Sequence, residues 1–277
     1  MAADLSRLVP LQEGGSRPPL YCVHAVSGSP YAYAGLARRL GPEQPVYGFE
    51  APGFDNDRQP IASLPELAAE YAEVLREFSR SRYGTDGDYR LLGWSLGGVV
   101  VFEMAKLLAA QGIEVAGVIL VDTGRPEVMD LPSELDVLRR FLRDLMGRSD
   151  DDPPELEAVL CGQPADAGPA EVFLLVESAG VLPPEIDAEV LADQYAVFRA
   201  LLQAFYSVHL TGRWGGVATH LLAQASPRQE MDWSPFFPQL TERIVPGTHH
   251  SIWTGDNLNS LGGVVRELLT DQVAPCP

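Results

Sequence analysis

The residues with the clearest chemical potential form the pentapeptide Gly93-Trp94-Ser95-Leu96-Gly97. An apolar run precedes it and an apolar helical pattern follows it, so the serine lies at a turn between a strand and a helix. In this G-x-S-x-G setting, a tight turn raises the serine hydroxyl above the end of a sheet. Glycine is needed at both ends because a side chain would collide across so sharp a turn. The sequence therefore predicts a nucleophilic serine at position 95, followed by a helix whose first N–H groups favour negative charge.

A serine hydroxyl is a weak nucleophile at neutral pH and needs a base that an acid orients. In chains with this turn, the serine is followed by the acid and then by a histidine. His209 falls in a helical pattern and His220 in a strand pattern, and both positions favour a structural role. His249 and His250 follow a strand on a loop, where a side chain can reach across the sheet edge. One of these two is expected to be the base.

The position of the acid is indicated by the strands that follow the serine. Asp122 stands at the carboxyl end of the strand directly after the serine helix, where sites gather in open α/β sheets. The usual alternative lies after the next strand, at about 224–226, where the sequence has no carboxylate. Glu230 is the first acidic residue beyond that point. We therefore expect Asp122 to be the acid, with a strand-end aspartate that caps a turn as the alternative.

Negative charge on a tetrahedral intermediate requires two backbone N–H donors. Leu96, which follows the serine, is expected to supply one. The other is expected from the small-residue loop after the first buried strand, with Val26 as the donor. His24 in the same loop is expected to be buried and to hold the loop, with substrate contact as the alternative. The sequence has no P-loop, GxGxxG order or metal-like cluster, so it predicts neither a cofactor nor a metal.

The elements around these residues alternate between strand and helix, which predicts an α/β fold. Such alternation implies a mostly parallel central sheet that helices cover on both faces. Apolar runs predict strands at 20–23, 45–50, 89–94, 115–121, 217–223 and 242–245. Helical patterns are found at 31–40, after the capping box that begins at Ser63, from the serine to Gly112, and at 257–273.

Between the strands at 115–121 and 217–223 the sequence predicts only helices, over about 125–205. An all-helical insertion just past the serine is most simply a lid over the site, and its apolar faces suggest a lipophilic substrate wall. The alternative is a peripheral helical subdomain without a gating role. Residues 1–18 are polar and end in a Gly-Gly-Ser-Arg-Pro run, which predicts a linker segment before one domain at 19–277.

Composition limits the classes of partner. The net charge of −18 over 277 residues argues against nucleic acid and anionic membranes as partners. No basic start followed by an apolar core indicates a secretion signal, and no apolar run is long enough to span a bilayer. Cys22, Cys161 and Cys276 lack metal-like spacing and suit free thiols in a reducing compartment. The expected location is the cytoplasm.

Taken together, these motifs resemble the thioesterase domain that ends nonribosomal peptide and polyketide synthases, an α/β-hydrolase. The resemblance covers nearly the whole chain and rests on five motifs. They are Pro19-Leu20-Tyr21-Cys22-Val23-His24 with Gly28, Tyr47-Gly48-Phe49-Glu50-Ala51-Pro52-Gly53, Gly93-Trp94-Ser95-Leu96-Gly97-Gly98, Val121-Asp122-Thr123 and Val245-Pro246-Gly247-Thr248-His249. It implies Asp122 as the acid and selects His249 over His250 as the base. It also implies Val26 as the first oxyanion donor. Ile252-Trp253 departs from the more usual Met-Leu and is expected to reshape the wall beside His249.

The resemblance implies a function in chain release. A carrier protein or carrier domain, upstream in the same synthase, would deliver an acyl or peptidyl chain on its phosphopantetheine arm. Ser95, deprotonated by His249, would take up the chain as an ester, and water or an internal amine or hydroxyl would release it. The family's editing branch usually has Pro-Gly-Arg after the second strand and a later acid. Here the sequence has Pro52-Gly53-Phe54 and lacks that acid, which favours the release branch.

Three other functions remain open to the same residues. A standalone editing thioesterase would use the same machinery on misloaded carriers. A freestanding carboxylesterase would use it on small esters without any carrier. An inactive hydrolase fold that serves as a binding module is the non-enzymatic alternative.

Overall fold

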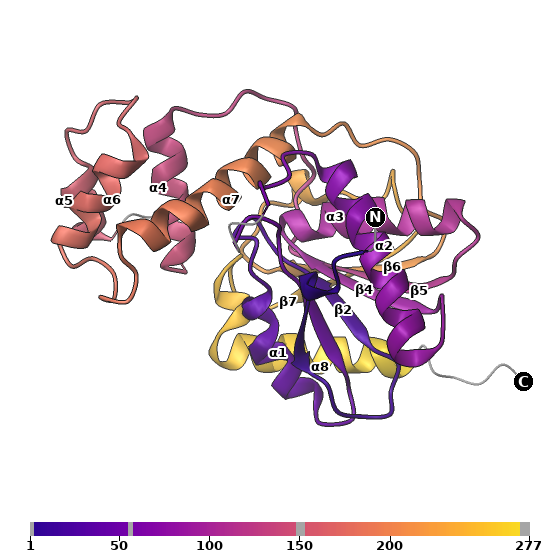
Figure 1. Ribbon diagram of the computed structural model, residues 1–277. Helices are drawn as coiled ribbons and strands as arrows, with labels where there is room; N and C mark the ends of the chain where they lie inside the picture. The colour runs from indigo at the N-terminus through magenta and orange to yellow at the C-terminus, as the bar shows by residue number, and fades with distance from the viewer. Residues whose placement is uncertain (1–2, 55–57, 148–152, 272–277) are drawn as a thin grey trace, which may run out of the picture.

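The computed structural model describes residues 3–54, 58–147 and 153–271. Within these residues, seven strands form one sheet in the order β1-β3-β2-β4-β5-β6-β7 (Figure 1). β1 pairs antiparallel with β3, and the other neighbours are parallel. The strands are β1 (Leu8–Gln12), β2 (Leu20–Val23), β3 (Val46–Phe49), β4 (Tyr89–Trp94), β5 (Val115–Val121), β6 (Val217–Ala223) and β7 (Gln239–Val245).

Helices cover both faces of the sheet. Because side chains alternate along a strand, Tyr21 and Val23 of β2 pack on one face, while Leu20 and Cys22 pack on the other. The first face carries α2 and α3 and the second carries α1 and α8. These helices are α1 (Ala34–Leu40), α2 (Leu64–Tyr83), α3 (Leu96–Ala110) and α8 (Gly255–Asp271). Burial of β2 and β4 on both faces explains why they read as continuous apolar runs.

The predicted α/β class is confirmed, and four of the predicted strands have the expected bounds. β2, β4, β5 and β6 begin and end as the apolar runs indicate. Ser63 caps α2 as predicted, since its Oγ accepts a hydrogen bond from Glu66 N–H at 3.4 Å just before the helix begins. The helix predicted at 31–40 is a 3₁₀ turn over Pro30–Tyr33 followed by α1. Of the helix predicted at 257–273, residues 272 and 273 lie outside the described residues.

The sequence analysis did not predict β1, which lies inside the segment expected to be a linker. Its residues pair with β3 from Leu8 opposite Phe49 to Gln12 opposite Val46. The strand contains Pro10, which cannot donate to a ladder and is tolerated because β1 is at the edge of the sheet.

Between β5 and β6 the chain forms a helical segment, comprising α4 (Glu134–Leu145), α5 (Pro154–Leu160), α6 (Pro169–Ser178) and α7 (Ala188–Ser207). Figure 1 shows α4, α5 and α6 grouped beyond the sheet, with α7 running from that group back toward it. The segment has its own apolar cluster, in which Phe141 of α4 packs on Phe173 of α6 and Phe198 of α7. Val197 and Leu201, on another face of α7, belong instead to the core beneath α2 and α3. α7 therefore joins the helical segment to the sheet.

No helix among the described residues has the length and apolar character needed to cross a bilayer. Cys22 is buried and Cys161 is exposed, and both are free thiols. Cys276 lies outside the described residues.

Candidate active site

Ser95 occupies a strained turn between β4 and α3. Its φ of 55° and ψ of −125° are unusual for a residue with a side chain. The turn is held by the Ser95 N–H, which donates to Val121 O of β5 at 3.0 Å. Neighbouring glycines make the turn possible, because a Cβ on Gly93 would lie 2.2 Å from Gly97 O. A Cβ on Gly97 would lie 2.3 Å from Val23 O, so α3 begins in contact with the end of β2.

Replacing Gly97 by alanine is therefore expected to lower the free energy of unfolding by about 3 kcal/mol, because backbone atoms on both sides must move. Gly263, an exposed mid-helix residue of α8 whose Cβ would meet nothing within 4 Å, provides a matched control. Gly263→Ala is expected to raise stability by about 1 kcal/mol through helix propensity. Urea unfolding curves of the two variants measure both changes. Equal stability of the two variants would contradict the tight turn.

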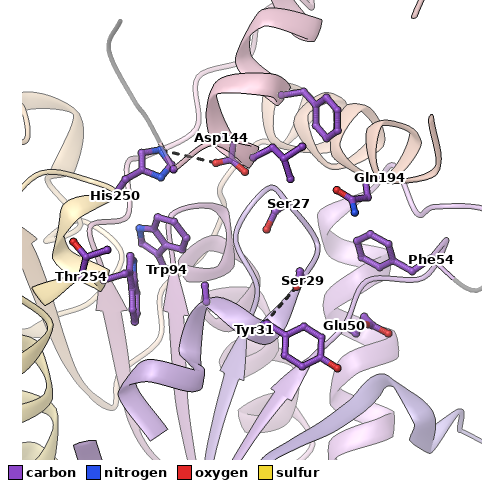
Figure 2. A pocket seen from close by; sticks show the side chains of 15 residues that line it. Ser27, Ser29, Tyr31, Glu50, Phe54, Trp94, Asp144, Gln194, His250 and Thr254 are labelled. Carbon is purple, nitrogen blue, oxygen red and sulfur yellow. Dashed lines mark hydrogen bonds and ion pairs between the residues drawn. The ribbon is translucent and has the colours of Figure 1, made fainter. Parts of the chain in front are cut away.

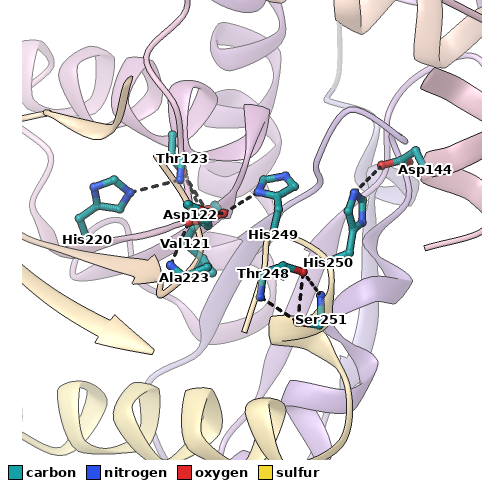
Figure 3. Close-up of polar contacts among 12 residues, drawn as sticks. Val121, Asp122, Thr123, Asp144, His220, Ala223, Thr248, His249, His250 and Ser251 are labelled. Atoms are coloured by element: carbon teal, nitrogen blue, oxygen red, sulfur yellow. Dashed lines mark hydrogen bonds and ion pairs between the residues drawn. The ribbon is translucent and has the colours of Figure 1, made fainter. Parts of the chain in front are cut away.

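Asp122 is fully buried at the end of β5 and is held by hydrogen bonds from three directions. Its Oδ1 accepts from Ala223 N–H at 2.9 Å. Its Oδ2 accepts from Ser226 Oγ at 2.8 Å and from His249 Nδ1 at 2.7 Å (Figure 3). The carboxylate therefore fixes the imidazole with Nδ1 as the donor, which leaves Nε2 of His249 available to accept a proton.

The electrostatics of this pair keep Asp122 ionised. Burial by itself raises the pKa of Asp122, but the hydrogen bond and the charge of His249, together with the Ala223 and Ser226 donors, hold its pKa below the ordinary value. An ionised, buried carboxylate stabilises positive charge on the adjacent imidazole. The pair can thus accept a proton at Nε2 and hold it.

The loop of residues 246–250, which carries the predicted base His249 and is called the base loop below, packs against the serine turn. The His249 ring is tilted against Trp94, the residue before Ser95, with 5.1 Å between the ring centroids. Among the described residues the Ser95 hydroxyl makes no hydrogen bond, and its contact with His249 Nε2 is therefore not formed in this state. Catalytic hydrogen bonds are often long in unliganded enzymes and tighten when substrate binds.

The sequence motifs left His249 and His250 as alternative candidates for the base, and the two histidines have different surroundings in the structure. His250 points toward α4 of the helical segment, and its Nε2 lies 3.9 Å from Asp144 Oδ1 (Figure 3). Of these two histidines, His249 is the one whose hydrogen bond to Asp122 the structure shows. The two rings lie nearly perpendicular, with 5.2 Å between their centroids.

His24 and His220 are buried and have structural surroundings. His24 is fully buried, with its ring nitrogens 2.6 Å from Tyr71 Oη and 2.7 Å from Ala25 O. His220 Nε2 accepts from Thr123 N–H at 3.2 Å. Burial lowers the pKa of His24 and of His220 to about 4, so both are neutral near pH 7. The prediction of a helix at His209 is wrong, because α7 ends at Ser207 and leaves His209 on an exposed loop.

The two residues predicted to donate backbone N–H groups to the oxyanion, Leu96 and Val26, lie at the start of α3 and in the loop after β2. Leu96 opens α3, so its N–H has no acceptor within the helix. Val26 lies in the loop after β2 and, with His249, lines a cavity of about 340 Å³. The start of α3 is in contact with the end of β2. Leu96 on α3 and Val26 in the loop after β2 therefore come from neighbouring elements.

A larger cavity of about 580 Å³ lies between the sheet and the helical segment (Figure 2). Trp94 and Trp253 line it from the side of the serine turn and the base loop. Phe141 and Asp144 of α4 and Gln194 of α7 line it from the helical segment. Ser95 is not among the described lining residues, but Trp94, which directly precedes it, lines this cavity.

Sequence reasoning missed two polar residues at this site. Ser226 stands where the sequence analysis looked for a later carboxylate, and its hydroxyl instead donates to Asp122. Asp144 reaches the base loop from a helix more than a hundred positions earlier in the chain, and no motif marks it. Among the described residues, no group of three or more His, Cys, Asp and Glu side chains could hold a metal ion.

Comparison with known proteins identifies relatives among multidomain synthetases. The dimodular nonribosomal peptide synthase of Bacillus subtilis (strain 168) is 40% identical over 118 residues, which are 43% of this chain and 5% of that protein. Malpibaldin synthetase of Mortierella alpina is 39% identical over 120 residues, or 43% of this chain and 2% of that protein. The probable non-canonical nonribosomal peptide synthetase CymA of Salinispora arenicola (strain CNS-205) is 26% identical over 275 residues, or 96% of this chain. The chain spans only a few per cent of the length of these relatives.

Solved structures share the fold. The holo-AB3403 four-domain nonribosomal peptide synthetase superposes with a TM-score of 0.78 at 23% identity, covering 98% of this chain and 20% of that one. The Vlm2 thioesterase domain superposes with a TM-score of 0.67 at 21% identity and covers 98% of both chains. These likenesses and the mostly parallel sheet identify the α/β-hydrolase fold. The family model described as "Thioesterase domain" matches residues 18–160, just over half of the chain, including Val26, Ser95 and Asp122. The chain therefore belongs to the thioesterase-domain family.

Proposed function

We propose that this chain is a release thioesterase of a nonribosomal peptide or polyketide synthase. It would take an acyl or peptidyl chain from the phosphopantetheine thioester of a carrier domain and release it through an ester on Ser95. The single observation that carries the proposal is the hydrogen bond between buried Asp122 and partly exposed His249, on a loop packed against the turn that holds Ser95 at a positive φ. Membership of the thioesterase-domain family indicates that the acyl donor is a thioester.

In the acylation step, Ser95 Oγ attacks the thioester carbonyl carbon while His249 Nε2 takes the hydroxyl proton. The N–H groups of Val26 and Leu96 stabilise the oxyanion of the tetrahedral intermediate. When the intermediate collapses, the carbon–sulfur bond breaks and the leaving sulfur receives the proton from His249. Asp122 remains ionised throughout and stabilises the imidazolium.

In the release step, a water molecule or an amine or hydroxyl of the acyl chain attacks the Ser95 ester. His249 takes the proton of that nucleophile and returns it to Ser95 Oγ as the ester bond breaks. Water gives a linear acid, and an internal nucleophile gives a ring. The cavity beneath α4 and α7 would hold the chain during both steps, which gives the helical segment the role of a lid.

Several observations favour release from a synthase over the alternatives. The relatives are named as peptide synthetases, and the likeness to CymA extends over nearly the whole chain. The editing branch would be expected to have Pro-Gly-Arg after β3, where this chain has Pro52-Gly53-Phe54. A binding module without activity would not need an ionised carboxylate buried against a histidine, because such a charge is costly to desolvate.

Asp122→Asn is expected to lower kcat by about 10⁴-fold, because an amide can present its NH₂ to Nδ1 and impose the wrong tautomer on His249. Ser226→Ala, which removes one neutral donor to the same carboxylate, is expected to lower kcat by less than about tenfold. Steady-state kinetics with an acyl N-acetylcysteamine thioester compare the two variants. Similar losses of kcat in Asp122→Asn and Ser226→Ala would contradict the proposed role of Asp122.

The function itself is tested with a panel of acyl chains loaded on a carrier domain, together with the matching simple ethyl esters. Mass spectrometry of the products identifies both the preferred donor and the mode of release. Faster turnover of carrier-bound chains than of ethyl esters is expected, with a linear acid or a ring as the product. Equal or faster turnover of the ethyl esters would favour a carboxylesterase and overturn the proposal.

A further inference from the structure

The cavity between the sheet and the helical segment has an acidic and aromatic lining. Two of its 15 described lining residues are carboxylates, Glu50 and Asp144, and none is lysine or arginine. Trp94, Trp253 and Phe141 contribute aromatic surface. The sequence analysis predicted a lipophilic wall from the apolar helix faces, and it did not anticipate acidic groups in that wall. A purely hydrocarbon chain would desolvate the Asp144 carboxylate and would offer it neither a hydrogen bond nor a positive charge in return.

Asp144 is the carboxylate that lies near the reacting groups. Its side chain is 19% exposed, and Figure 2 shows it on the upper side of the cavity facing His250. The distance of 3.9 Å to His250 Nε2 exceeds that of a hydrogen bond. Burial raises the pKa of Asp144 to about 6, and the charge of His249 opposes this shift. At neutral pH Asp144 is thus an ionised carboxylate with little solvent around it, which a cation would stabilise.

Two of the basic residues of α4 lie toward a different space. Arg140 and Arg143 line the smaller cavity of about 340 Å³, together with Val26 and His249, and neither lines the larger one. Arg140 also donates a hydrogen bond to Tyr206 Oη. Asp144 lines both cavities. It therefore lies between the smaller cavity, which the two arginines line, and the larger cavity with its acidic and aromatic lining. Among the described residues that line the larger cavity, His250 is the one basic side chain, so a ligand is the other source of positive charge for Asp144 there.

We propose that Asp144 is a specificity-determining residue that binds a protonated amine or guanidinium group carried by the acyl chain. The aromatic surfaces of Trp94 and Trp253 contribute cation–π attraction to the same group. The inference rests on the proposed function, because the cation must belong to the chain that Ser95 takes up. It adds a substrate class, namely acyl chains with a basic group at some distance from the thioester carbonyl.

The test compares ω-aminoacyl N-acetylcysteamine thioesters of increasing length with alkanoyl thioesters of the same number of heavy atoms. At the length that reaches Asp144, the wild-type protein is expected to have a kcat/KM about tenfold higher for the amino chain than for its neutral match. Asp144→Asn is expected to abolish this ratio, mainly through KM. Asp144→Lys is expected to invert it in favour of a chain that ends in a carboxylate.

Asp166→Asn provides the charge-matched control, because Asp166 is exposed on the loop between α5 and α6 and lines neither cavity. It is expected to keep the wild-type ratio. The wild-type ratio should also fall as the pH drops through about 6, since Asp144 becomes neutral while the amine stays protonated.

The outcomes separate this inference from the proposed function. If the wild type hydrolyses neutral and amino chains equally at every length, or if Asp144→Asn keeps the preference, the cation site is wrong and the thioesterase proposal stands. If the wild type hydrolyses no thioester, both fail. A tenfold preference that disappears in Asp144→Asn and persists in Asp166→Asn supports both.

Discussion

Ser95→Ala is expected to lower kcat on an acyl thioester by about 10⁴–10⁶-fold, the loss seen when a covalent nucleophile is removed from a triad. Without Oγ no acyl-enzyme forms, and the residual rate comes from the oxyanion donors and substrate binding alone. Alanine can keep the turn as serine does, because the φ of 55° strains both residues alike. The loss should therefore come without a change in the free energy of unfolding beyond about 1 kcal/mol.

Ser260→Ala is the matched control for this change, because Ser260 is an exposed serine on α8. It is expected to leave kcat unchanged. Both variants are measured by product formation under single-turnover and steady-state conditions. A Ser95→Ala protein that retains more than about one hundredth of the wild-type kcat would show that another group performs the chemistry.

His249→Ala is the second change with a large expected effect, also about 10⁴–10⁶-fold in kcat. The variant loses the base that deprotonates Ser95, and it leaves Asp122 as a buried carboxylate without the hydrogen bond from His249 Nδ1. His250→Ala is the natural comparison, since the two residues are adjacent but His250 faces Asp144 instead. Its expected effect is less than about tenfold.

The two histidine variants can be distinguished by chemical rescue. Added imidazole is expected to restore part of the activity of His249→Ala, because a small base can occupy the space over the serine turn. It should not affect His250→Ala. An active His249→Ala together with an inactive His250→Ala would reverse the assignment of the base.

The parts of the fold that could be predicted are those whose sequence carries a local physical signal. β4 and β5 are largely apolar runs, with Asp88 just before β4 and Asp122 just after β5, and both strands are buried between the helical layers of the sheet. Ser95 and its glycines could be found because the turn requires residues of those sizes. His249 could be chosen over His250 only through the family resemblance, because the residues alone place both on one loop.

The unpredicted features arise from contacts between distant segments. β1 is a strand only because it pairs with the edge of β3, and its Pro10 gives no local indication of a strand. Ser226 becomes a partner of Asp122 only when β6 lies beside β5. Asp144 faces the base loop because α7 holds the helical segment against the sheet, and helical periodicity cannot indicate that placement.

The central claim, that the chain reacts through an ester on Ser95, is tested most directly by trapping that ester. The protein is mixed with an acyl N-acetylcysteamine thioester, quenched in acid within the first turnover, and analysed by intact-protein and peptide mass spectrometry. We expect one added acyl mass on the peptide that contains Ser95, and no added mass in Ser95→Ala. Turnover of the thioester with no acyl mass on the protein, or with the mass on a different residue, would contradict the mechanism.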